Sequence, residues 1–343
     1  MSKSVGIWVA LVLAMGGLFV ASLLLGSVEI TWEDWRAILG GETEGSAGAI
    51  VLQLRLPRSL AALAAGAGLG IGGLLMQTLF RNPLAGPGIL GVTSGAGLGV
   101  AAVMLSGAGT ATIAALRSME VGATWTLLIA ASLGAGLVLA VILTLSWRIK
   151  DSVVLLIVGV MVGQITMALV SVWQYVSQPE EIREYLLWSF GSFSGVTPFQ
   201  AGLLLGIVTL GSLVTALLAK QWNLLLLGET YARSLGLSVS QARIFLITIT
   251  SVLAGAITAF CGPIGFIGIA VPHLARGITG SSTHQVLVPA TALCGAGLML
   301  FCDILSRLPG SAGSIPLNAV TILIGAPVVI TVLLRRSRYQ GMW

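Results

Sequence analysis

The chain has 343 residues, of which 56% are hydrophobic and 8% charged, and its mean hydropathy is +1.02. Soluble domains carry about 25% charged residues, so most of this surface must face lipid or protein instead of water. The net charge of +5 is not gathered in a basic patch interleaved with aromatic residues, which argues against a nucleic-acid-binding protein.

Apolar stretches of nearly membrane-spanning length recur along the whole chain. A helix needs roughly 20 apolar residues to cross a bilayer core. We expect ten spans, at residues 5–28, 59–80, 87–106, 124–147, 152–175, 198–219, 240–260, 263–278, 286–305 and 314–334. The eighth is short and contains Pro263 and Pro272, which predicts a broken or irregular span. Little strand-like alternation accompanies these stretches, so an all-α polytopic membrane protein is predicted.

The first span and two amphipathic segments allow more specific predictions. The stretch at residues 5–28 is longer than the apolar core of a secretion signal, which favours a retained first helix. Residues 31–40 combine a helix start with an apolar face and are expected on the outer side as an amphipathic segment, as are residues 180–193. Each is either a connector or a surface that faces a partner.

Lysine and arginine residues indicate the orientation. One set of alternating loops holds 11 of the 17 basic residues and the other holds six. By the positive-inside rule both termini are predicted to be cytoplasmic. Arg55 and Arg58 then lie on the outer side, where positive charge is scarce. Arginines there can anchor to lipid phosphate, and membrane lipid is an expected partner in any case.

Several classes of site are not supported by the sequence. The predicted spans hold few carboxylates or histidines, which disfavours an ion-coupled secondary transporter but leaves it as the main alternative. His273 fits a hydrogen-bonded structural role, and Cys261, Cys294 and Cys302 fit buried thiols, so no metal site is predicted. No lysine follows a glycine as in a P-loop, so ATP would have to be hydrolysed by another chain and this chain is not expected to be an enzyme. A purely structural membrane scaffold is a third class.

Two glycine-rich features are more specific. GPGILG at residues 86–91 is loosely echoed by GPIGFIG at residues 262–268, and the topology places these motifs at opposite membrane faces. This predicts an inverted repeat of spans two to five and seven to ten. The cytoplasmic connection at residues 221–239 contains a short helix bounded by glycines, which is either a surface linker or an element that a partner can push.

Five motifs, in order, resemble those of the FecCD family, the permease subunits of type II ABC importers for iron-siderophores, haem and cobalamin. The motifs are LRLPR at 54–58, FRNPLA at 80–85 with GILG at 88–91, GETYARSLG at 228–236, GPIGFIG at 262–268 with VPH at 271–273, and GAP at 325–327. Before residue 50 the chain matches the family only in character. The resemblance implies one transmembrane permease domain over residues 1–343, with ten helices, in a bacterial cytoplasmic membrane.

The resemblance also implies partners. The family's permease pairs with a second copy or with a close relative, two cytoplasmic ATPase subunits bind ATP and Mg²⁺ beneath it, and a soluble binding protein delivers substrate from outside. No cofactor is then expected in this chain. The choice between iron-siderophore, haem and cobalamin stays open.

Site residues follow from the same resemblance. Coupling to the ATPase is expected at Gly228, Glu229, Ala232, Arg233, Leu235 and Gly236. The cytoplasmic gate is expected at Asn82, Leu84 and, with a poorer match, Ser152. Docking of the binding protein is expected at Arg55, Arg58 and Arg307, because a guanidinium can pair a carboxylate through two hydrogen bonds. Neutral residues expected to line the pathway, suited to a bulky chelate, are Met161, Gln164, Met167, Ser171 and Gln174.

Overall fold

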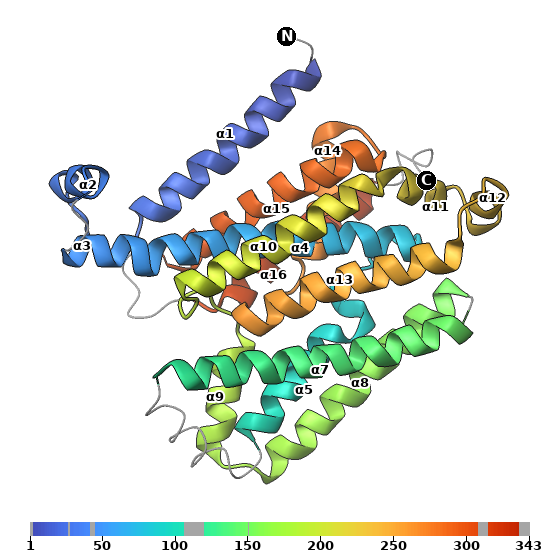
Figure 1. Cartoon of the computed structure of the whole chain (residues 1–343), viewed down its shortest axis with the longest axis horizontal. Coiled ribbons are helices and arrows are strands. Elements are labelled where there is room, and N and C mark those ends of the chain that lie inside the picture. Colours follow the sequence, from blue (N-terminus) through green and yellow to red (C-terminus); the bar gives the residue numbers. More distant parts are fainter. Residues whose placement is uncertain are drawn as a thin grey trace.

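A computed structural model gives the fold and describes residues 3–26, 28–41, 45–105, 120–149, 151–307 and 315–335. Within these ranges every regular element is a helix, and the helices form one bundle (Figure 1). The predicted all-α class is therefore confirmed.

The helices match the predicted spans closely. The longer ones are α1 (Lys3–Leu24), α4 (Leu56–Phe80), α7 (Glu120–Arg148), α8 (Ser152–Val176), α10 (Pro198–Leu217), α13 (Val239–Cys261), α15 (His284–Ser306) and α16 (Leu317–Arg335). The shorter ones are α2 (Trp32–Leu39), α3 (Ser46–Ala49), α5 (Val92–Met104), α9 (Pro179–Ser189), α11 (Ala219–Leu226), α12 (Glu229–Ser234) and α14 (Ile267–Thr279), with a π-helical turn η1 (Ile50–Arg55) and a 3₁₀ turn η2 (Pro87–Leu90).

Length and composition qualify 7 helices among the described residues as membrane spans. The predicted spans that fall on α5, α14 and α16 coincide with helices that do not meet that criterion. The number of crossings, like the orientation of the termini, stays a prediction.

The predicted amphipathic segment at residues 31–40 is a helix with a closed N-terminal cap. The Asp34 amide donates to the Thr31 hydroxyl over 3.2 Å, and the Thr31 amide donates back to the Asp34 carboxylate over 2.9 Å. The hydroxyl and the amide of Thr31 lower the pKa of the Asp34 carboxyl. No residue of α2 is buried, so the helix stands away from the bundle at one end of it (Figure 1).

Helix α4 is the central element of the bundle. It packs against α10, α13, α14 and α15 (Figure 1). The span begins earlier than the predicted residue 59, because α3, η1 and α4 form one continuous helical run over Ser46–Phe80. A proline inside a helix removes a backbone donor, and here Pro57 lies in the first turn of α4, after the π-helical turn that ends at Arg55. Arg55 and Arg58 consequently belong to a helix and do not precede one.

Close helix crossings depend on glycine. A Cβ atom on Gly66 of α4 would overlap the carbonyl oxygen of Gly295 in α15, and a Cβ atom on Gly295 would overlap the oxygen of Gly66. Gly99 of α5 lies in the same way against the Ala130 carbonyl of α7. Glycines at these crossings therefore bring helix backbones together.

The two Gly-Pro motifs meet inside the bundle. Pro87, at the start of η2, lies against Gly268 of α14, and Gly268 lies against Gly73 of α4. The two motifs therefore contact each other within the protein, while their placement toward opposite membrane faces stays a prediction. The contact is possible because α5 and α14 have 13 residues each and begin only after their motifs have entered the bundle: η2 precedes α5, and residues 262–266 precede α14. The inverted repeat stays a prediction.

We expect Gly66→Ala to lower the apparent melting temperature of the detergent-solubilised protein. The added methyl group must push α4 and α15 apart, and such overpacking costs about 1–3 kcal/mol. The matched control is Gly206→Ala in α10, where no heavy atom lies within 4 Å of an added Cβ. Equal melting temperatures for the two variants would contradict the assigned α4–α15 contact.

Candidate functional site

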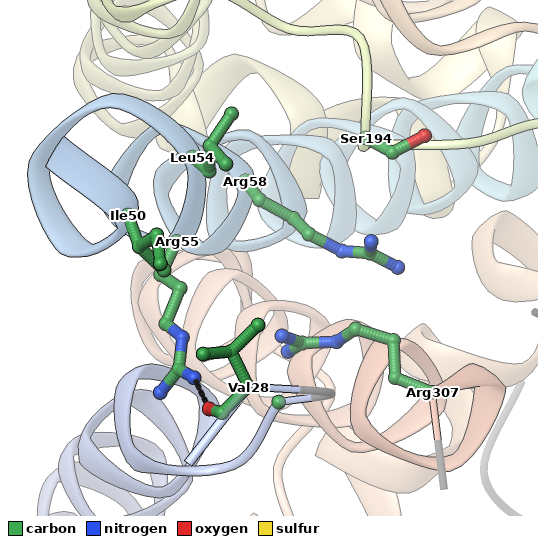
Figure 2. Close-up of a pocket in the computed structure, with 8 residues that line it drawn as sticks. Val28, Ile50, Leu54, Arg55, Arg58, Ser194 and Arg307 are labelled. Atoms are coloured by element: carbon green, nitrogen blue, oxygen red, sulfur yellow. Dashed lines mark hydrogen bonds between the residues drawn. The ribbon is translucent and has the colours of Figure 1, made fainter. Parts of the chain in front are cut away.

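Three predicted docking arginines come together at the end of the bundle near α3. Arg55 ends η1, Arg58 lies in the first turn of α4, and Arg307 follows α15. All three line one cavity of about 220 Å³, together with Gly26, Val28, Ile50, Leu54 and Ser194 (Figure 2). The fold thus joins residues that are far apart in sequence.

Asp303 of α15 links two of these arginines. Its carboxylate lies 2.9 Å from the Arg58 guanidinium and 2.7 Å from that of Arg307, and its side chain is only 1% exposed. A buried carboxylate is costly unless it is paired and hydrogen-bonded, and two arginines meet that need. With three guanidinium charges and one carboxylate, the cluster carries a charge of +2.

Arg55 has a different task. Arg55 is only 5% exposed. Its guanidinium donates hydrogen bonds to the carbonyl oxygens of Leu23 over 2.8 Å and Leu24 over 2.9 Å, and also to the carbonyl oxygen of Val28. The last carbonyls of a helix have no partner within it, so Arg55 caps the end of α1. In Figure 2 its guanidinium turns toward Val28, whereas Arg58 and Arg307 reach into the cavity.

The predicted coupling residues lie on and around α12, at the end of the bundle opposite α2 (Figure 1). Gly228 and Gly236 have φ angles of +117° and +85°, a region that glycine adopts readily, and this explains the glycines at both boundaries. Arg233 and Leu235 are exposed and available to a partner, whereas Ala232 is fully buried. Ala232 therefore packs α12 onto the bundle and cannot itself reach a partner.

Glu229, at the start of α12, is held by groups from other helices. Its carboxylate lies 2.9 Å from the Arg243 guanidinium of α13 and accepts a hydrogen bond from the Ser152 hydroxyl of α8 over 3.1 Å. Arg233 lies 3.6 Å from the same carboxylate. One predicted gate residue, Ser152, is therefore in direct contact with a predicted coupling residue.

The other predicted gate residues form a tight turn after α4. The Leu84 amide donates to the Asn82 side-chain oxygen over 3.0 Å, and Leu84 is exposed. The His273 ring nitrogen Nε2 donates to the Pro83 carbonyl over 2.9 Å. This bond fits the structural role expected for His273, and it fixes the turn to α14.

The predicted pathway residues lie on α8. Met161, Gln164, Met167 and Ser171 are exposed on the single chain and Gln174 is partly exposed. The opposite face of α8 is buried, with Gly163 against Gly91 at the start of α5. The predicted lining residues thus face away from the bundle of their own chain.

Sequence reasoning missed Asp303 and Arg243 as members of these clusters. Asp303 is four residues before Arg307, a spacing that pairs charges on a helix, and it is an acidic residue in an apolar stretch. That signal could have identified Asp303. Nothing in the sequence relates Arg243 to Ser152, because their contact depends on how α8 and α13 pack.

Comparison with known proteins identifies the family. The FecCD transport family model matches residues 11–335. This chain belongs to the FecCD transport family. Curated relatives include the vitamin B12 import system permease protein BtuC of Klebsiella pneumoniae, 39% identical over 90% of this chain and 89% of the relative. BtuC of Escherichia coli O127:H6 is 38% identical over 92% of this chain and 91% of the relative.

Two solved structures share the fold. An inward-facing metal-chelate type ABC transporter superposes with a TM-score of 0.83 at 30% identity, covering 96% of this chain and 99% of the other. PsaBC from Streptococcus pneumoniae has a TM-score of 0.52 at 15% identity over 87% of this chain and 95% of the other, which is a likeness of fold alone.

We expect Asp303→Asn to destabilise the protein. Loss of the carboxylate leaves two poorly hydrated guanidinium groups facing each other, and breaking a buried pair costs about 3 kcal/mol. The apparent melting temperature should fall, whereas Glu180→Gln, an exposed acidic residue on α9, should change it little. If both variants melt with the wild type, Asp303 does not organise the cluster.

Proposed function

We propose that this chain is the membrane-spanning permease subunit of an ATP-driven importer that carries cobalamin or an iron chelate, either an iron-siderophore or haem, across a bacterial cytoplasmic membrane. The observation that carries this proposal is the match to the FecCD family over residues 11–335, together with 37–39% identity to vitamin B12 import permeases. The neutral outward face of α8 suits a bulky chelate that passes without ligation.

The proposed energy source is a pair of ATPase subunits that dock at α12. The sequence offers no P-loop lysine of its own. Arg233 is 61% exposed, and with the exposed Leu235 it gives α12 a surface that a cytoplasmic partner can press. Closure of the ATPases on ATP would then move α12 and, through it, the helices around the pathway.

The proposed substrate donor is a soluble binding protein that docks at the opposite end. Arg58 and Arg307 are the two members of the arginine cluster whose guanidinium groups reach into the cavity, so they are the expected carboxylate receptors (Figure 2). A second permease copy, identical or closely related, would cover the exposed face of α8 and give the assembly two docking sites.

Uptake in proteoliposomes tests the function and the substrate together. With the partner ATPase and binding protein present, we expect ATP-dependent accumulation of one of three offered compounds: cyanocobalamin, ferrichrome or haemin. The permease alone should hydrolyse no ATP. Accumulation driven by a sodium or proton gradient with the ATPase omitted would instead establish an ion-coupled transporter.

A second measurement tests the docking surface. Arg58→Gln keeps the ion pair between Arg307 and Asp303 but removes one receptor, so we expect the binding protein to dissociate about tenfold more readily at low salt. The loss should shrink at physiological salt, where the Debye length falls to about 8 Å. Arg148→Gln, an exposed arginine at the end of α7 and outside the expected docking end, is the control. Unchanged docking by Arg58→Gln would return Arg58 to a lipid-anchoring or structural role.

A further inference from the structure

We propose that Arg243 is a positioning residue. It holds the ATPase-coupling helix α12 against the start of α8, where the predicted gate residue Ser152 lies, so that the two helices move together. The inference rests on the proposed function, because it assigns the route by which α12 acts. Arg243 carries no motif of its own and is assigned from its contacts alone.

One guanidinium joins three segments of the chain. Arg243 Nη2 lies 2.9 Å from Glu229 of α12 and 3.4 Å from the Ser152 hydroxyl of α8, and Nη1 donates to the Ile149 carbonyl over 2.7 Å. Ile149 directly follows α7. The planar fork of an arginine can hold acceptors on separate elements in fixed positions, which the single point charge of a lysine does less well.

Burial makes this connection strong. The Arg243 side chain is 7% exposed, and a charge-assisted hydrogen bond shielded from water is worth more than one on the surface. Arg233 contacts the same carboxylate but is mostly exposed and lies 3.6 Å away, so its contribution is small. Glu229 is therefore anchored inward, to α13 and α8.

A second gate element reaches the same point. Arg81 caps the C-terminus of α4 in a left-handed conformation and directly precedes Asn82. A Cβ atom on Gly228 would lie 3.3 Å from Arg81 Nη2, so the Arg81 guanidinium packs on the backbone where α12 begins. Both predicted gate segments thus converge on two adjacent residues, Gly228 and Glu229.

Mechanical coupling requires such a junction. Helix α12 has six residues, only Ala232 of them buried, and short non-helical links join it to its neighbours, so without further contacts a partner could shift it relative to the bundle. The Arg243 contacts oppose that independent movement, because they hold the first turn of α12 against the start of α8. A packing role without coupling would hold α12 in place but would not relate its movement to transport.

The test compares Arg243→Gln and Arg243→Lys with the wild type, each assembled with the partner ATPase and binding protein in proteoliposomes. We expect Arg243→Gln to reduce uptake of the compound that the wild type carries by at least about fivefold, the scale of a modest coupling energy. ATP hydrolysis should change less than uptake, so the number of ATP molecules spent per substrate rises. Uptake by Arg243→Lys should lie between that of Arg243→Gln and that of the wild type. Arg148→Gln, which replaces an exposed arginine at the end of α7, should match the wild type.

A direct measurement of the junction uses a variant in which the three native cysteines are replaced. Spin labels on Thr230 of α12 and Val153 of α8, both exposed, then report the distance between the two helices. With ATP and vanadate the distribution of label-to-label distances should stay single and narrow in the wild type but broaden in Arg243→Gln.

If Arg243→Gln fails to assemble, Ser152→Ala removes one contact of the same network and should raise the ATP spent per substrate. If the variants keep the wild-type ratio of ATP hydrolysed to substrate imported and the wild-type distribution of label-to-label distances, the inference is overturned while the importer function stands. A wild-type complex without ATP-driven uptake would overturn the proposed function first.

Discussion

The close approach of α4 to its neighbours is the constraint on which the rest of the structure depends. Backbone groups inside a bilayer must be satisfied within helices, and helices in lipid associate through packing more than through the hydrophobic effect. Gly66 and Gly73 supply that packing, because each lies against the backbone of another helix. One continuous helical run then extends from the arginine cluster, at Arg55 and Arg58, to Arg81 beside the gate turn.

Buried charge is organised in the same way at both ends of the bundle. At one end Asp303 is enclosed by Arg58 and Arg307, and at the other Glu229 is held by Arg243. In each cluster the acidic residue pairs with an arginine of another helix, Asp303 of α15 with Arg58 of α4 and Glu229 of α12 with Arg243 of α13. Burial raises the cost of separating such pairs, so each cluster fixes the relative position of the elements that contribute to it.

Much of the fold could be predicted from the sequence, and the physical reason is length. Apolar runs of about 20 residues leave few alternatives to helices, and all ten expected spans fall on helices. The place where the Gly-Pro motifs meet could not be predicted, because Pro87 and Gly268 come together only through the depth at which two short helices begin. The arginine cluster was predictable as a set of residues, but not the inward turn of Arg55, which depends on where α1 ends.

The two faces of α8 relate packing to transport. Its buried face, at Gly159 and Gly163, lies against the backbone of the segment that begins α5, while the face with Met161 and Gln164 is uncovered in the single chain. Lipid leaves the neutral polar groups of such a face without hydrogen-bond partners, and this supports the proposal that a second permease copy covers it. Because Ser152 at the start of α8 contacts Glu229 of α12, the proposed displacement of α12 would act on the helix that carries this face. The predicted pathway residues and Ser152, which contacts the predicted coupling residue Glu229, thus belong to one helix.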